Sequence, residues 1–86
     1  MYQVVYLDSV VKKDIPGLGK SDRENIKRAI ERKLMVDPVG FGKPLQYSLK
    51  GCRRLRVRAY RVIFRIEPET MTVVVVKIGH RREVYD

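Results

Sequence analysis

The chain has 86 residues and a mass of 10.1 kDa, and its 19 Lys and Arg against 10 Asp and Glu give a net charge of +9. A chain of this length predicts a single domain over residues 1–86 and excludes a separate cofactor domain. The charge favours a polyanionic partner, and an apolar content of 44% is enough for a folded core. An internal disulfide is excluded, because Cys52 is the only cysteine.

The N-terminal residues lack the basic and apolar regions of a signal peptide. No apolar run approaches the ~20 residues of a membrane span. A single cysteine suits a reducing compartment. We therefore expect a cytoplasmic, soluble protein without a membrane partner.

The chain opens with a predicted strand over residues 2–7, which are rich in β-branched and aromatic side chains. Asp8-Ser9 offers an N-cap for a short helix. Pro16-Gly17 interrupts the helical spacing of the apolar residues. One short helix is expected between these two signals.

A second helix is predicted over about 22–36. Ser21 and Glu24 have the spacing of a capping box, and apolar residues recur at helical intervals after them. Asp37-Pro38 and two glycines then end the helix. We expect an irregular connection from there to Gly51.

Three antiparallel strands are predicted over 54–58, 60–66 and 71–78. The junction at Arg58-Ala59 permits only a tight hairpin, although it lacks the glycine or Asn-Gly that such a turn prefers. The last strand is almost entirely apolar, as is typical of a central strand buried on both faces. The element order predicts an α+β fold with two N-terminal helices packed on a twisted four-stranded, mainly antiparallel sheet.

The positive charge is concentrated in the second half of the chain. Residues 1–40 carry eight basic and six acidic side chains, whereas residues 41–86 carry eleven and four. Strand alternation directs Leu55 and Val57 to the core and the arginines between them to the opposite face. Seven basic residues and no acid lie in this region: Lys50, Arg53, Arg54, Arg56, Arg58, Arg61 and Arg65.

Most kinds of catalytic site are poorly supported. One histidine and one cysteine, with no carboxylate cluster at ligand spacing, argue against a metal site. A nucleophilic pair of Cys52 and His80 is formally possible, but a lone cysteine is more often a small apolar filler. No glycine-rich loop joins a strand to a helix, which excludes a nucleotide-binding loop. We expect no cofactor and no metal.

The remaining chemistry is that of an arginine-rich sheet face and a C-terminal cluster of His80, Arg81, Arg82 and Tyr85. Cleavage of RNA requires removal of the 2′-OH proton, stabilisation of charge on the phosphate and protonation of the leaving oxygen. Histidine, arginine and tyrosine can share these tasks. Taken alone, the same basic strands more often form a binding surface. Composition alone therefore favours a nucleic-acid-binding domain over an enzyme.

A resemblance changes this balance. The segments Arg54–Ile66 and Val76–Tyr85, with the opening strand and the helical hairpin, resemble toxins of the RelE/ParE superfamily over essentially the whole chain. Toxins of the RelE branch are ribosome-dependent endonucleases that cut mRNA in the A site and are neutralised by a cognate antitoxin. The resemblance therefore implies a metal-independent mRNA interferase, with ribosomal RNA, mRNA and an antitoxin as partners.

The resemblance also assigns roles to individual residues. It implies that Arg61 stabilises the phosphate transition state, that Arg81 is a proposed general acid, and that Tyr85 stacks on a base or assists proton transfer. Arg54 and Arg56 replace residues that are often lysines, and guanidinium is a poor base. His80 is then the better candidate for proton transfer. Further RNA contacts are expected from Lys50, Arg53, Arg58, Arg65, Lys77 and Arg82.

Two alternatives remain. A ParE-like toxin would share the fold but inhibit DNA gyrase by binding it. That branch generally lacks the basic residues and the tyrosine, so the presence of Arg61, Arg81 and Tyr85 favours the nuclease. The other alternative is a nucleic-acid-binding module without catalytic activity.

Overall fold

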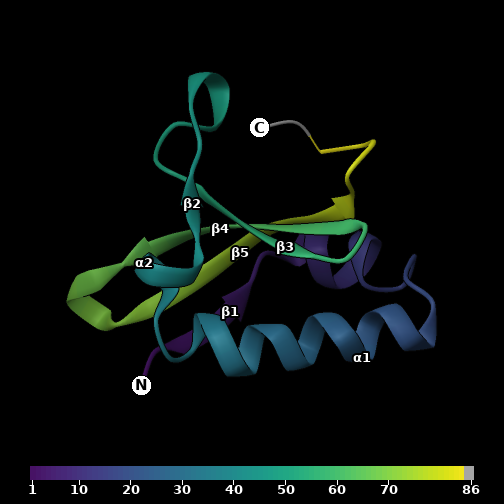
Figure 1. Ribbon diagram of the computed structural model, residues 1–86, viewed down its shortest axis with the longest axis horizontal. Coiled ribbons are helices and arrows are strands. Elements are labelled where there is room, and N and C mark those ends of the chain that lie inside the picture. The colour runs from purple at the N-terminus through teal and green to yellow at the C-terminus, as the bar shows by residue number, and fades with distance from the viewer. Residues whose placement is uncertain (85–86) are drawn as a thin grey trace.

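The computed structural model describes residues 1–84, which form a mixed five-stranded sheet in the order β1-β5-β4-β3-β2 (Figure 1). β1 pairs in parallel with β5, and the other neighbours are antiparallel. The expected α+β fold is confirmed, and the predicted strand count of four is corrected to five. The strands are β1 (Gln3–Tyr6), β2 (Lys43–Pro44), β3 (Arg53–Val57), β4 (Tyr60–Glu67) and β5 (Thr72–His80).

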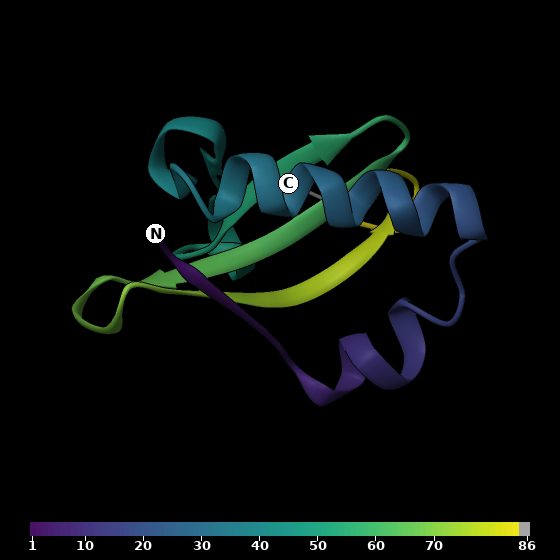
Figure 2. The ribbon, with the colours of Figure 1, turned by 90° about the horizontal axis from the view of Figure 1, so that it is seen from below.

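The helices lie mainly on one face of the sheet. Helix α1 crosses below the strands, whereas the loop between β2 and β3 extends from the opposite face, on the side where the segment that follows β5 also lies (Figures 1 and 2). The helical elements are η1 (Val10–Asp14), α1 (Lys20–Ala29), η2 (Ile30–Leu34), α2 (Pro38–Phe41), η3 (Tyr47–Leu49) and η4 (Pro68–Thr70). The sheet therefore has a helix-covered face and a second face framed by a loop and the C-terminal segment.

The second predicted helix exists, but it begins earlier than the capping-box pattern indicated. Gly19 is its N-cap, so Ser21 already lies in the first turn. α1 continues without a break into η2, a wider turn in which the Met35 N–H donates to the Ile30 carbonyl at 3.0 Å. Backbone geometry at Gly19, and not a side-chain cap, sets the start of this helix.

The predicted irregular connection after residue 37 contains a short helix and a strand. Asp37 caps α2, its carboxylate accepting a hydrogen bond from the Gly40 N–H at 3.0 Å. The two residues of β2 then pair with β3. This segment attaches a fifth strand to the sheet edge and leads into the loop of residues 45–52.

The main core lies between the helices and one sheet face. Strand alternation gives this face its apolar side chains, which interlock with those of the helices. The buried members are Val10, Leu18, Ile26, Ile30, Leu34, Leu55, Val57, Val62, Phe64, Val73, Val75 and Ile78. Burial of β5 on both faces is confirmed, since Val74 on the opposite face is also buried.

The hairpin between β3 and β4 forms without a glycine. Arg58 takes the left-handed conformation itself, with φ of 57°. Such a conformation is unfavourable for residues other than glycine, by roughly 1–2 kcal/mol. Arg58 therefore lies in the turn and is not part of the row of arginines predicted along the strand.

Asp14 accepts hydrogen bonds from the end of β5, beyond the point where the pairing of β5 with β1 stops. Its side chain is only 6% exposed, and its carboxylate accepts hydrogen bonds from the Ile78 N–H at 3.0 Å and the Lys77 ammonium at 3.1 Å. β1 pairs only as far as Val75. Asp14 thus continues the pairing of the β5 edge with a side chain and joins η1 to the sheet.

Within residues 1–84, no helix is long and apolar enough to cross a membrane.

Candidate nucleic-acid interface

Three arginines meet on the sheet face opposite α1: Arg54 and Arg56 of β3 and Arg61 of β4, here called the arginine cluster. Arg56 and Arg61 are direct cross-strand partners, so their Cβ atoms lie about 5 Å apart. Arg54 lies two residues before Arg56 in β3, on the same face, and pairs with Ile63. The register therefore brings together three residues that the sequence predicted for one site.

The arginine cluster concentrates three like charges at one place on the sheet. Arg54 is only 5% exposed, and its burial lowers the pKa of its guanidinium, with the charges of Arg56 and Arg61 lowering it further. Like charges directly opposite each other on neighbouring strands destabilise a sheet. A bound phosphate would offset both the desolvation of Arg54 and the repulsion between the like charges, so the face suits an anion.

The C-terminal segment folds back onto this face. Gly79 is the cross-strand partner of Arg61, and a Cβ at Gly79 would approach the Val84 side chain to 2.8 Å. Val84 is buried against Ile63 and Leu45. Only glycine leaves room for this contact, which holds the segment after β5 beside the arginine cluster.

Arg81 directly follows the last residue of β5. Its N–H donates to the Ala59 carbonyl at 2.8 Å, which extends the pairing of β5 with β4 by one step. Arg81 begins the turn that follows β5, and its side chain is exposed. It therefore lies at the end of the sheet beside the β3–β4 hairpin, and its catalytic role stays a prediction.

His80 lies on the other face. It is paired with Tyr60, and the two rings make an edge contact with centroids 5.6 Å apart. The Tyr60 hydroxyl donates to the Asp22 carboxylate of α1, which raises the pKa of Tyr60. The structure therefore places His80 on the helix-covered face and does not bring it to Arg61, as a proton-transfer role would require.

The predicted RNA-binding residues are dispersed. Arg53 was expected to contact RNA, but in β3 it alternates with Arg54 and so lies on the same face as Leu55 and Val57. Its guanidinium donates to the Gly42 carbonyl at 3.0 Å, which connects the end of α2 to β3. Lys77 is paired with Asp14, and Arg65 with Glu67 at 3.7 Å. Lys50, Arg58 and Arg82 are exposed in the loop, the hairpin turn and the C-terminal turn.

Tyr85 lies outside the described residues. Among residues 1–84, no three His, Cys, Asp or Glu side chains lie close enough together to hold a metal ion.

Sequence reasoning missed two residues of this face. One is Glu83, whose carboxylate would lie 3.6 Å from a Cβ added at Gly79. Tyr47 is exposed on the loop between β2 and β3 and lines two cavities there. A bulky aromatic residue in a polar loop was the available signal for Tyr47.

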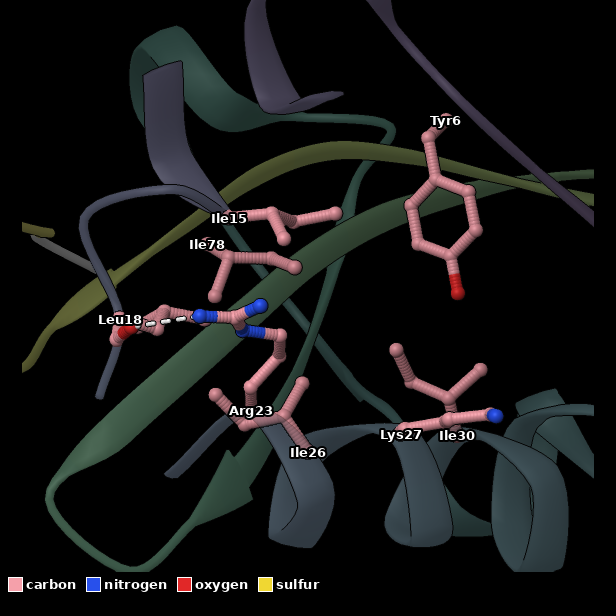
Figure 3. Close-up of a pocket in the computed structure, with 8 residues that line it drawn as sticks. All are labelled: Tyr6, Ile15, Leu18, Arg23, Ile26, Lys27, Ile30 and Ile78. Carbon is pink, nitrogen blue, oxygen red and sulfur yellow. Dashed lines mark hydrogen bonds between the residues drawn. The ribbon is translucent and has the colours of Figure 1, made fainter. Parts of the chain in front are cut away.

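The helix side has an apolar cavity of about 250 Å³ between η1 and α1 (Figure 3). Arg23 crosses it and donates to the Leu18 carbonyl at 3.3 Å. The cavity is lined by Tyr6, Ile15, Leu18, Arg23, Ile26, Lys27, Ile30 and Ile78.

The family model described as "ParE toxin of type II toxin-antitoxin system, parDE" matches residues 5–85. The chain belongs to this toxin family. Its cation-rich sheet face is thus a surface of a type II toxin, as the RelE/ParE resemblance predicted. Membership of this family is compatible with either activity, gyrase inhibition or RNA cleavage.

Relatives of this ParE-family toxin include Toxin RelG of Mycobacterium tuberculosis, which is 39% identical over 52 residues. That match spans 60% of this chain and 60% of RelG. The toxin–antitoxin complex RelBE2 of the same organism contains a chain with 29% identity and a TM-score of 0.86, with 93% of this chain and 91% of that chain covered. The intact RelBE complex of E. coli has a chain with 20% identity and a TM-score of 0.76, covering 93% and 96%, which shows a shared fold.

Proposed function

We propose that the toxin is an endoribonuclease that cuts mRNA in the ribosomal A site. The observation that carries the proposal is the arginine cluster, a buried Arg54 beside the opposed pair Arg56 and Arg61. Groups held in place before the reaction stabilise developing charge more effectively than groups that must reorganise. The similarity to RelG and to the toxin of the RelBE2 complex supports the RelE branch, and the resemblance to that branch implies RNA as the substrate.

In the proposed reaction, the 2′-OH loses its proton to water and its oxygen bonds to the adjacent phosphorus. The bond from phosphorus to the 5′-oxygen breaks, and that oxygen takes up a proton from water. Arg61 and Arg56 stabilise the negative charge that develops on the phosphate oxygens, and Arg54 adds to their field from below the surface. Arg81 lies at the edge of the face, where it can contact the leaving oxygen. The guanidinium groups stay protonated, so they position and stabilise but do not remove the 2′-OH proton.

Brief induction of the toxin in a bacterium, followed by mapping of mRNA ends, tests this proposal. We expect cuts within translated regions and 5′ fragments that end in a 2′,3′-cyclic phosphate, the product of 2′-OH attack. The purified toxin should keep its activity under chelation of trace transition metals that leaves ribosomes assembled. Intact messages in arrested cells would overturn the proposal, and products with a 5′-phosphate would remove the 2′-OH mechanism.

The ParE description of the matching family supports a second candidate, inhibition of DNA gyrase through protein contacts. The same induction experiment separates the two functions. A gyrase inhibitor induces a DNA-damage response while messages stay intact, whereas an mRNA endonuclease stops protein synthesis first. No effect on growth would favour a non-catalytic nucleic-acid-binding module.

The proposed regulatory partner is a cognate antitoxin with an acidic segment that folds on binding. β1 is at the sheet edge, and Val5 and Leu7 are exposed there, so a strand can add to it. The apolar cavity between η1 and α1 can accept large side chains of the same segment (Figure 3). RelBE2, named as a toxin–antitoxin complex, supports this partner by similarity.

Co-expression with the neighbouring gene tests the antitoxin proposal. We expect the adjacent gene product to restore growth and to co-purify with the toxin at nanomolar or tighter affinity. An adjacent product that neither rescues growth nor co-purifies would contradict the proposal. A matched control is the same product truncated before its acidic segment, which should not rescue growth.

A further inference from the structure

Tyr47 combines almost complete exposure with an unfavourable backbone. Its side chain is 87% exposed, and its φ of 58° is in the left-handed region that bulky residues rarely adopt. Packing within the described residues does not require the ring, since solvent surrounds it. A large aromatic side chain held in this way is typical of a contact residue, because its apolar faces gain most from a planar partner.

The loop that carries Tyr47 is ordered. Leu45 is buried on the sheet, and its N–H donates to the Cys52 carbonyl at 3.0 Å, which closes the base of the loop. The Lys50 N–H donates to the Tyr47 carbonyl at 3.0 Å, and Leu49 packs against the same small core. The ring is therefore presented by a fixed turn, which lowers the entropy lost on binding.

Two cavities meet at Tyr47 on the face opposite α1. One, of about 320 Å³, is lined by Lys43 and by Arg54 of the arginine cluster; the other, of about 290 Å³, is lined by Lys77 and Glu83. The loop extends from this face of the sheet, and the segment that follows β5 lies on the same side (Figure 1). The aromatic ring thus lies beside the cations Lys43 and Arg54, whereas on its other side Lys77 is accompanied by Glu83 and paired with Asp14.

We propose that Tyr47 is a stacking platform for an unpaired RNA base whose neighbouring phosphate binds the arginine cluster; this inference rests on the proposed ribonuclease function. Proteins that hold single-stranded nucleic acid combine cations along the backbone path with aromatic rings on which bases stack. Lys43 and Arg54 supply the cations beside the ring, and Tyr47 supplies the surface. Because every base has a π-face, this subsite tolerates different bases.

Binding to a short single-stranded 2′-O-methyl oligoribonucleotide, which cannot be cleaved, tests the inference by fluorescence anisotropy. We expect Tyr47→Ala to weaken binding about 5- to 150-fold, and Tyr47→Phe to bind within about twofold of the wild type, because phenylalanine keeps the ring. The slope of the logarithm of the binding constant against the logarithm of the salt concentration should not change in Tyr47→Ala. In Arg56→Ala the magnitude of this slope should fall by about 1, because one phosphate contact is lost. An oligonucleotide of abasic nucleotides should bind the wild type as weakly as the intact one binds Tyr47→Ala.

Wild-type affinity in Tyr47→Ala, with affinity lost in Arg56→Ala, would overturn the stacking role and leave the proposed function intact. Loss of antitoxin affinity in Tyr47→Ala with unchanged RNA affinity would also overturn it, since the ring would then be a protein contact. No binding of the oligonucleotide to the wild type would equally contradict the inference. Mapping of mRNA ends decides the proposed function separately in each of these cases.

Discussion

Replacing Arg61 with alanine is expected to lower the rate of mRNA cleavage by on the order of 10² to 10³, the usual effect of removing one well-placed transition-state contact. Arg61 lies between Arg56 on β3 and Gly79 on β5, so a phosphate at the cluster must lie next to it. The rate is measured on programmed ribosomes with purified toxin. Arg81→Ala should lower it similarly.

Arg32→Ala is the matched control, because it removes the same charge from an exposed helix position away from the arginine cluster. We expect cleavage within about twofold of the wild type for this variant. Arg61→Ala should still unfold cooperatively, which would show that the variant is folded. Unchanged cleavage by folded Arg61→Ala would contradict the role of the cluster.

Gly42→Ala is expected to cause the largest loss of stability, a fall of about 3 kcal/mol in the free energy of unfolding. A Cβ at Gly42 would lie 2.3 Å from Cζ of Phe64, which is fully buried, and 2.7 Å from the Pro38 carbonyl oxygen. Neither atom can move without displacing α2 or the core. For a domain of this size, the melting temperature should fall by about 12–24 °C.

Gly17→Ala is the control for this prediction. Its new Cβ would be 3.5 Å from the nearest atoms, which is ordinary van der Waals contact. We expect a melting temperature equal to the wild type or slightly higher, because alanine restricts the unfolded chain more than glycine does. Equal melting temperatures for the two variants would show that α2 adjusts to the added methyl group.

Periodicity in the sequence was sufficient to predict which face of β3 and β4 carries the arginines of the cluster. Alternation in β3 and β4 separated Leu55 and Val62 from Arg56 and Arg61, and the structure keeps this separation. Register between strands cannot be derived from period alone, since a shift of one residue exchanges the faces. For this reason the position of His80 opposite Tyr60, away from Arg61, could not be predicted from the sequence.

Short helices and strands were missed because they contain too few residues to show a repeating pattern of apolar side chains. β2 has two residues and α2 one turn, and the Asp37 signal that caps α2 was interpreted only as the end of the preceding helix. A bulge in the pairing of β4 with β5 gives Val76 no direct partner, so that it packs with Ile63 on the cation-rich face. Neither feature has a local sequence signature that distinguishes it from a loop.

The parallel pairing of β1 with β5 determines when the protein can become active. Gln3 pairs with Thr72, so β1 cannot pair until β5 has been synthesised. This pairing closes a loop that contains most of the chain, and closing so long a loop is slow. β5 also supplies Gly79 beside Arg61. An incomplete chain that ends before Thr72 lacks the central strand on which both the edge strand and the arginine face depend. Truncated translation products should therefore be harmless to the cell that makes them, because toxicity requires nearly the whole chain.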